Sequence, residues 1–184
     1  MLYRENIPNY LTLFRIAVIP LLVGVFYLPT EWSNIVAATL FVLAGITDYL
    51  DGFLARHWQV QSSLGRFLDP IADKLLIAAI LVVLVDTRIL QGWHILPTLA
   101  ILCREILVSG LREHLAELKV NVPVTYLAKW KTAAQMAALF FLLLGSCTPE
   151  SLGGVTLGLG LLWLSAIVTL YTGYAYLRKG LDHF

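Results

Sequence analysis

The sequence predicts an all-α integral membrane protein with six transmembrane helices in a single domain over residues 1–184. Hydrophobic residues make up 59% of the chain, above the roughly 45–50% that is usual in soluble domains. The mean hydropathy is +0.78, and several apolar segments are long enough to span a bilayer. No basic patch stands apart from the ends of these segments, so we expect no nucleic-acid partner.

The first three helices are expected over residues 8–28, 32–57 and 66–85. Asn9, Thr12 and Arg15 interrupt the first apolar segment, and no small-residue cleavage site follows it, so it is expected to remain as an uncleaved span. A polar run separates the second helix from the third. Asp69 followed by Pro70 is typical of an N-cap and a first helical turn.

The last three helices are expected over residues 94–117, 126–145 and 152–177. The fourth begins apolar and ends amphipathic, and the fifth carries Lys129 and Lys131 in its opening turns. In the sixth, Gly154 and Gly158 are four residues apart. Such spacing favours close packing, either against another helix or against a second copy of the chain.

The distribution of cations predicts the orientation of these spans. With six spans both termini share one side of the membrane, and twelve of the thirteen lysines and arginines fall on that side. Only Arg88 falls on the other. Cytoplasmic loops are rich in lysine and arginine. Both termini and the loop between the second and third helices are therefore expected in the cytoplasm.

Four of the six aspartates in the chain lie within 26 residues, at Asp48, Asp51, Asp69 and Asp73. Steps of three and four residues place each pair on one face of a helix. Asp48 lies eight residues before Arg56. On a helix, Asp48 is therefore about 12 Å deeper in the membrane than Arg56. Four anions there would repel one another and lose hydration unless a cation lay between them. Oxygen ligands without thiol or imidazole favour Mg²⁺ or Mn²⁺, and we expect two such ions.

Two structural alternatives remain open beside this metal site. Arg56, Arg66 and Lys74 could neutralise the carboxylates in a set of salt bridges, although cations near helix ends tend to extend to the interface. The small residues Gly52 and Ala55 leave space on one helix face beside the carboxylates, which would admit a phosphate or a nucleotide. The same small residues could instead serve packing between membrane helices.

Eight positions at fixed spacing form one motif in this stretch. It is Asp48-x2-Asp51-Gly52-x2-Ala55-Arg56-x8-Gly65-x3-Asp69-x3-Asp73. The motif resembles in full the signature of the CDP-alcohol phosphotransferases. The opening Asn6-Ile7-Pro8-Asn9, the Cys103-Arg104-Glu105 segment and the Lys129-Trp130-Lys131-Thr132 segment extend the likeness to a bacterial member of the family over nearly the full length.

The resemblance implies a membrane enzyme with six helices, commonly a homodimer, in the bacterial inner (cytoplasmic) membrane with its active site facing the cytoplasm. Its substrates would be the lipid nucleotide CDP-diacylglycerol and the acceptor sn-glycerol 3-phosphate, and CMP would be released. By analogy, the four aspartates hold two divalent ions, Asp73 is the general base, and the residues that border the CDP-diacylglycerol are Gly52, Ala55, Arg56 and Gly65.

The acceptor phosphate needs cations of its own. Arg104 and Arg112 are two turns apart, and Lys129 and Lys131 begin the next helix. Arginine forks and lysine point charges suit a dianionic phosphate. Pairing with Glu105, Glu113 or Glu117 is the structural alternative.

Asn9, Thr12 and Arg15 form a third polar group, which is expected near the nucleotide, with helix capping and headgroup contact as alternatives. Two other functions also remain open. One is the same reaction with inositol phosphate, serine or phosphatidylglycerol as the acceptor, and the other is a cation transporter that uses the buried carboxylates.

Overall fold

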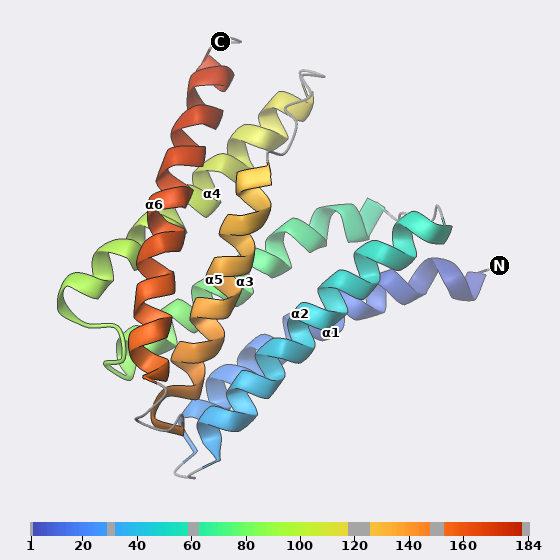
Figure 1. Cartoon of the computed structure of the whole chain (residues 1–184). Helices are drawn as coiled ribbons and strands as arrows, with labels where there is room; N and C mark the ends of the chain where they lie inside the picture. The colour runs from blue at the N-terminus through green and yellow to red at the C-terminus, as the bar shows by residue number, and fades with distance from the viewer. Residues whose placement is uncertain (1, 29–31, 59–62, 118–125, 148–152, 182–184) are drawn as a thin grey trace. The chain divides into compact units, whose positions relative to one another are not determined.

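A computed structural model describes residues 2–28, 32–58, 63–117, 126–147 and 153–181, and no strand occurs among them. The chain forms two compact units, Met1–Val83 and Leu84–Phe184, which Figure 1 colours from blue to green and from green to red. Each of the six predicted segments contains one α-helix. Their bounds are Leu2–Phe26 (α1), Ser33–Trp58 (α2), Ser63–Asp86 (α3), Ile95–Glu117 (α4), Tyr126–Leu144 (α5) and Gly154–Leu181 (α6).

In the first unit, α1 packs along α2 (Figure 1). The buried side of α1 carries Val18, Leu22 and Val25, and that of α2 carries Phe41 and Ala44. These steps of three and four residues are the period of a helix face. A continuous apolar stripe on each helix therefore explains why the two pair, and it fixes which residues at the ends of the helices face one another.

In the second unit, α6 packs against both α5 and α4 (Figure 1). Leu139, Leu142 and Leu143 of α5 are fully buried, as is Leu162 of α6. Gly158 of α6 lies against α5, because a Cβ built there would be 2.9 Å from Leu142 Cγ and 3.2 Å from the carbonyl oxygen of Ala138. The sequence left open whether this glycine serves a helix contact or a second copy, and the structure shows a contact within the chain.

Short 3₁₀ turns flank the helices of this unit at Gly92–His94 (η1) and Gly145–Cys147 (η2). Gly145 follows the last residue of α5 with a φ of +51°. This left-handed conformation is the common way to end a helix, and it favours glycine because a side chain would be strained there.

Within the described ranges, three stretches of helix are long and apolar enough to cross a membrane: residues Ser33–Leu54, Gly92–Leu115 and Gly154–Arg178. The apolar parts of α1 and α5, Tyr10–Phe26 and Trp130–Leu144, are shorter. Many large apolar side chains of the described residues are exposed, including Tyr171 and Ile167 of α6. Such a surface is suited to a lipid environment. The number of spans and the single-domain organisation stay predictions.

The third helix differs from expectation at its start. It begins at Ser63, so Asp69 and Pro70 lie inside the helix rather than at its N-cap and first turn. Pro70 is the eighth residue of α3, just beyond its first two turns, and because proline lacks an N–H group one intrahelical hydrogen bond is missing there. The interpretation of Asp69 as an N-cap is therefore wrong. The polar run at 58–65 falls partly outside the described residues.

Candidate active site

The packing stripes of the first unit become polar toward one end. On α1 the stripe continues from Val18 to Arg15 and Thr12, both buried. On α2 it continues from Ala44 to Asp48 and Asp51, again in steps of three and four residues. Because the apolar parts of the stripes pack together, their polar ends are brought together as well. We call Asp48, Asp51, Asp69 and Asp73 the aspartate cluster.

Arg15 lies among three carboxylates of the aspartate cluster and is fully buried. Its Nη1 is 3.0 Å from Asp48 Oδ1 and 2.7 Å from Asp73 Oδ1. Its Nη2 donates to Asp51 Oδ2 at 2.5 Å. One guanidinium thus joins three helices, since the carboxylates come from α2 and α3 and the arginine from α1. The sequence predicts Arg15 near the nucleotide, and the structure places it on the carboxylates.

The fourth carboxylate has a separate partner. Thr12 Oγ1 donates to Asp69 Oδ1 at 2.5 Å. Thr12 lies one helical turn before Arg15, so a single face of α1 contacts all four aspartates. The sequence contained a signal for this arrangement, because Thr12 and Arg15 share the spacing of the buried stripe.

Burial divides the cluster into a covered and an open side. The side chain of Asp51 is 5% exposed, whereas those of Asp48 and Asp73 are 47% and 50% exposed. Asp48 and Asp73 can therefore be approached by a bound molecule while Asp51 is held against Arg15. A group that exchanges a proton with a substrate belongs on the open side.

The fit of a divalent cation depends on Arg15. Within the described residues, no group of three or more His, Cys, Asp or Glu side chains is arranged so that it could hold a metal ion. The chemistry of the donors does fit Mg²⁺ or Mn²⁺, because four carboxylates and a threonine hydroxyl are all hard oxygen ligands. Three of these carboxylates also converge on one positive group. The donor atoms are therefore of the type that binds such an ion, while the three converging carboxylates are held by the guanidinium.

The remaining residues of the motif are only partly described. Gly52 lies on α2 directly after Asp51, and Gly65 is buried in α3. The side chains of Asn9, Ala55, Arg56 and Arg66 lie outside the described part of the chain. Their predicted roles stay predictions.

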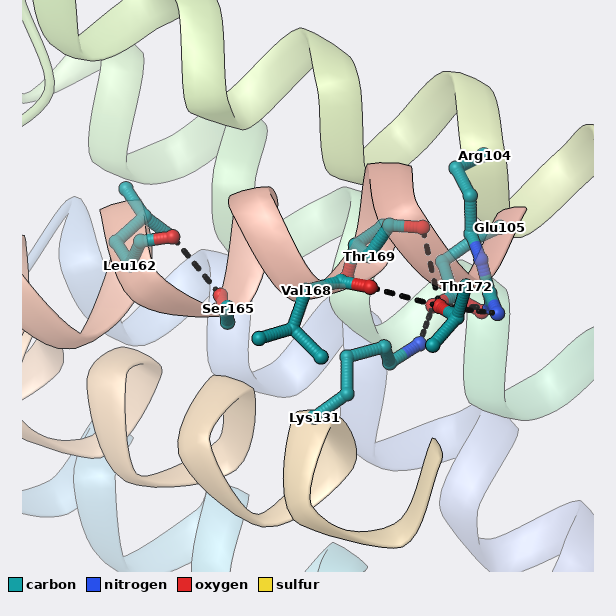
Figure 2. A network of polar contacts seen from close by, with 8 residues as sticks. All are labelled: Arg104, Glu105, Lys131, Leu162, Ser165, Val168, Thr169 and Thr172. Atoms are coloured by element: carbon teal, nitrogen blue, oxygen red, sulfur yellow. Dashed lines mark hydrogen bonds and ion pairs between the residues drawn. The ribbon is translucent and has the colours of Figure 1, made fainter. Parts of the chain in front are cut away.

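A second polar group lies in the other unit, where Glu105 of α4 binds two cations (Figure 2). Lys131 Nζ of α5 donates to Glu105 Oε1. Arg104 Nη1 is 3.4 Å from the same oxygen, and Arg104 Nη2 donates to Thr172 Oγ1 of α6 at 3.3 Å. We call Arg104, Glu105, Lys131 and Thr172 the Glu105 cluster. Two of the four predicted acceptor cations, Arg104 and Lys131, therefore pair with Glu105, which is the structural alternative that the sequence left open.

The Glu105 cluster is buried and its polar groups are incompletely bonded. Lys131 is 5% exposed. Arg104 Nε in the cluster is buried without a hydrogen-bond partner among the described residues. The same holds for Gln135 Oε1 and Thr169 Oγ1, which lie one helical turn from Lys131 on α5 and from Thr172 on α6. Buried polar atoms are nearly always bonded. Two cations and one carboxylate leave an excess positive charge, so this cluster is suited to an anion.

The polar side of α6 completes this group. Ser165, Thr169 and Thr172 are buried on one helix face, in steps of four and three residues. Ser165 Oγ and Thr172 Oγ1 donate to the carbonyl oxygens of Leu162 and Val168 in their own helix (Figure 2). The sequence-based reasoning missed this face, although its periodicity could have revealed it.

Gly173 also contributes to the Glu105 cluster. A Cβ built there would lie 3.0 Å from Arg104 Cγ. The glycine therefore lets the arginine stem lie directly against α6, from where Arg104 reaches Thr172. This residue too was missed by the sequence-based reasoning.

The other two predicted acceptor cations are less well placed. Arg112 of α4 is exposed, whereas Arg104 is mostly buried. The side chain of Lys129 lies outside the described residues. It is two residues from Lys131, a spacing that does not place two side chains on one helix face.

Comparison with known proteins agrees with the motif. The family CDP-alcohol phosphatidyltransferase matches residues 5–171. A protein of Rickettsia bellii (strain RML369-C) is 46% identical over 180 residues, which cover 98% of each chain. Proteins of Salmonella choleraesuis (strain SC-B67) and Pectobacterium atrosepticum are 45% and 44% identical, over 94% of this chain and 93% of theirs. All three are named CDP-diacylglycerol–glycerol-3-phosphate 3-phosphatidyltransferase.

Proposed function

Because the chain belongs to the CDP-alcohol phosphatidyltransferase family, we propose that it transfers the phosphatidyl group of CDP-diacylglycerol to sn-glycerol 3-phosphate. The products are phosphatidylglycerol phosphate and CMP. The observation that carries this proposal is the identity of 44–46% over nearly the whole chain to relatives that bear the name of this activity. The buried aspartate cluster supports it with a chemistry suited to phosphoryl-type transfer.

The proposed reaction forms one bond and breaks one. The acceptor hydroxyl oxygen forms a bond with the phosphorus that carries the diacylglycerol. The bond from that phosphorus to the oxygen bridging to CMP breaks, and CMP leaves with the electron pair. The hydroxyl proton passes to a carboxylate oxygen of Asp73, whose half-exposed side chain lies on the open side of the cluster. General-base catalysis of this kind contributes typically about 10²- to 10⁴-fold.

Two Mg²⁺ or Mn²⁺ ions are proposed as cofactors, held by Asp48, Asp51, Asp69 and Asp73. When bound, such ions neutralise the charge that develops on the attacked phosphate and on the leaving oxygen. The protein itself supplies the rigid placement of the carboxylates, through the packed stripes of α1 and α2 and the contacts made by Arg15 and Thr12. Gly52, Ala55, Arg56 and Gly65 are proposed to border the CDP moiety.

The acceptor phosphate is proposed to bind at Arg104 and Lys131, with Arg112 and Lys129 nearby in sequence. The excess positive charge of the Glu105 cluster supports this assignment. In the same proposal, Glu105 orients both cations, because a single carboxylate oxygen contacts each of them. A carboxylate that fixes two cations limits how far they can move when a phosphate is bound.

The setting proposed for this reaction is the bacterial inner membrane. All six helices would span it, with both termini and the aspartate cluster on the cytoplasmic side, and the protein would act as a homodimer. The excess of cations at one set of helix ends supports the orientation. The three long apolar stretches and the exposed apolar side chains support membrane insertion.

An acceptor panel tests the proposed function. Purified protein in detergent is supplied with CDP-diacylglycerol and Mg²⁺, and CMP release is measured with glycerol 3-phosphate, inositol phosphate, serine or phosphatidylglycerol. We expect release with glycerol 3-phosphate and at most background with the others. Release driven by another acceptor would replace the proposed substrate. No release with any acceptor, in protein that remains folded, would remove the enzymatic assignment.

A further inference from the structure

Arg15, which helps to place the carboxylates in the proposed reaction, also has unusual surroundings. It is a fully buried cation on an apolar helix, and both of its Nη atoms contact carboxylates at 3.0 Å or less. Its Nε is buried without a hydrogen-bond partner among the described residues. A buried guanidinium is costly unless it is paired. The contacts with Asp48, Asp51 and Asp73 therefore account for its presence.

Arg15 neutralises only part of the negative charge of the aspartate cluster. Four ionised carboxylates carry four negative charges, and Arg15 cancels only one of them. A substantial negative charge thus remains to attract further cations. At the same time, carboxylates from two helices are held within reach of one centre, where without a counter-charge they would repel one another.

The position of the guanidinium also overlaps with that of an ion. Divalent cations bind carboxylate oxygens at about 2.0–2.6 Å, whereas N–H···O hydrogen bonds are usually about 2.7–3.2 Å long. An ion that takes Asp48 Oδ1, Asp51 Oδ2 and Asp73 Oδ1 must lie where those oxygens converge, and that space is filled by the guanidinium. The guanidinium and a divalent cation therefore cannot contact these three oxygens at the same time.

We propose that Arg15 is the internal counter-cation of the aspartate cluster, and that its guanidinium and a divalent cation compete for Asp48, Asp51 and Asp73. Arg15 is thus a positioning residue, because it keeps the carboxylates gathered and yields them to the ion. This inference rests on the metal-dependent function proposed above. It goes beyond that function by giving α1 a role in controlling metal affinity.

The test measures Mn²⁺ binding in the intact protein, without turnover. Wild type, Arg15→Gln and Arg15→Lys are purified in detergent with EDTA, dialysed, and titrated with MnCl₂ while the melting temperature is recorded. Arg178→Gln is the matched control, because it removes an exposed arginine near the end of α6. A ligand that binds only the folded state raises the free energy of unfolding by RT ln(1 + [L]/Kd). Fitting the melting temperature against the Mn²⁺ concentration therefore gives a dissociation constant, which we call the Mn²⁺ midpoint.

Without metal, we expect Arg15→Gln to melt about 10 °C below wild type, because it removes the partner of the buried Asp51 and of the half-exposed Asp48 and Asp73. Saturating Mn²⁺ should restore most of this loss. The Mn²⁺ midpoint should fall about tenfold relative to wild type, because the competitor has been removed. Arg15→Lys should lower the midpoint about threefold, because one ammonium cannot hold three carboxylates as a planar fork does. Arg178→Gln should match wild type.

A midpoint that is unchanged or raised in either Arg15 variant would overturn the competition. If Arg15→Gln does not fold, the Arg15→Lys midpoint decides the matter alone. Wild-type CMP release is measured on the same preparation. Active wild type with unshifted midpoints contradicts this inference only, whereas inactive wild type contradicts the proposed function.

Discussion

Asp51 and Asp73 accept hydrogen bonds from the same arginine, yet they differ tenfold in exposure, at 5% and 50%. A buried carboxylate held by a charged partner serves to fix geometry. A half-exposed one can reach a substrate hydroxyl. This difference favours Asp73 over Asp51 as the proposed general base. Asp48 is exposed to the same degree, at 47%, so the choice of Asp73 over Asp48 rests on the family resemblance.

Replacing the proposed base should separate turnover from binding. Asp73→Asn keeps the size of the side chain but cannot accept the acceptor proton as a carboxylate does. We expect the kcat for CMP release to fall by about 10²- to 10⁴-fold, while CDP-diacylglycerol binding stays measurable. Turnover close to wild type would remove Asp73 as the base.

The acceptor site can be tested at Lys131, the most buried of its proposed cations whose side chain is described. Lys131→Gln should raise the KM for glycerol 3-phosphate about tenfold or more, because hydrogen bonds to charged groups are worth roughly 1.5–3 kcal/mol. The KM for CDP-diacylglycerol should change little. Arg178→Gln, an exposed charge change on α6, is the control. Equal rises for both substrates would argue against an acceptor-phosphate role.

At the scale of single residues, the sequence predicted the aspartates as a group but not their partners. The spacing of Asp48, Asp51, Asp69 and Asp73 requires no tertiary information, because it follows from the helix period. The position of Arg15 depends on how α1 is rotated against α2, which the short motif does not contain. Glu105 was foreseen as one possible partner. Thr172 was not, because it is 68 residues from Arg104 in the chain.

The helices of the second unit are held by close contacts that their glycines permit. Gly158 is buried against Leu142 and the backbone of Ala138, whereas Gly160, two residues later, has nothing within 4 Å of a built Cβ. The same substitution at these two positions therefore separates helix packing from helix propensity. Both substitutions raise the helix propensity by the same amount, but only the side chain added at Gly158 would clash with another helix.

Gly158→Leu should destabilise the protein, because overpacking costs typically about 1–3 kcal/mol. The expected fall in melting temperature is about 5 °C for a chain of this size. Gly160→Leu should melt within about 2 °C of wild type, since surface substitutions are usually near neutral. Thermal unfolding in detergent measures both. Equal melting temperatures for the two variants would contradict the packing of α6 on α5.

At the scale of helices, the apolar segments predicted the six α-helices closely and their ends less well. The start of α3 at Ser63 was missed because Asp69-Pro70 is a strong local signal for a helix start. In the folded chain Asp69 is instead bonded to Thr12. A tertiary hydrogen bond between distant residues is the kind of information that local signals do not contain.

The molecule as a whole is proposed to place its polar clusters on one side of the membrane. This orientation rests on the distribution of charge, with Arg88 as the single cation expected on the far side. Cys147 in η2 is exposed, so it can report on the end of α5 that is proposed to face away from the cytoplasm. The only other cysteine, Cys103, can be replaced by serine.

A maleimide that does not cross membranes should label Cys147 in intact spheroplasts of the Cys103→Ser variant. A cysteine added after Phe184, in a variant that lacks both natural cysteines, should be labelled only after the membrane is permeabilised. The physical reason is that α5 and α6 are each expected to cross once, which returns the C-terminus to the cytoplasmic side. Labelling in the opposite order would reverse the topology.

The most direct measurement of the central claim follows a radiolabel from acceptor to lipid. Purified protein is incubated with CDP-diacylglycerol, labelled glycerol 3-phosphate and Mg²⁺, and both labelled lipid and CMP are quantified. We predict one labelled phosphatidylglycerol phosphate for each CMP, and neither product when EDTA replaces Mg²⁺. CMP without labelled lipid, or equal product formation in EDTA, would contradict metal-dependent phosphatidyl transfer by the aspartate cluster.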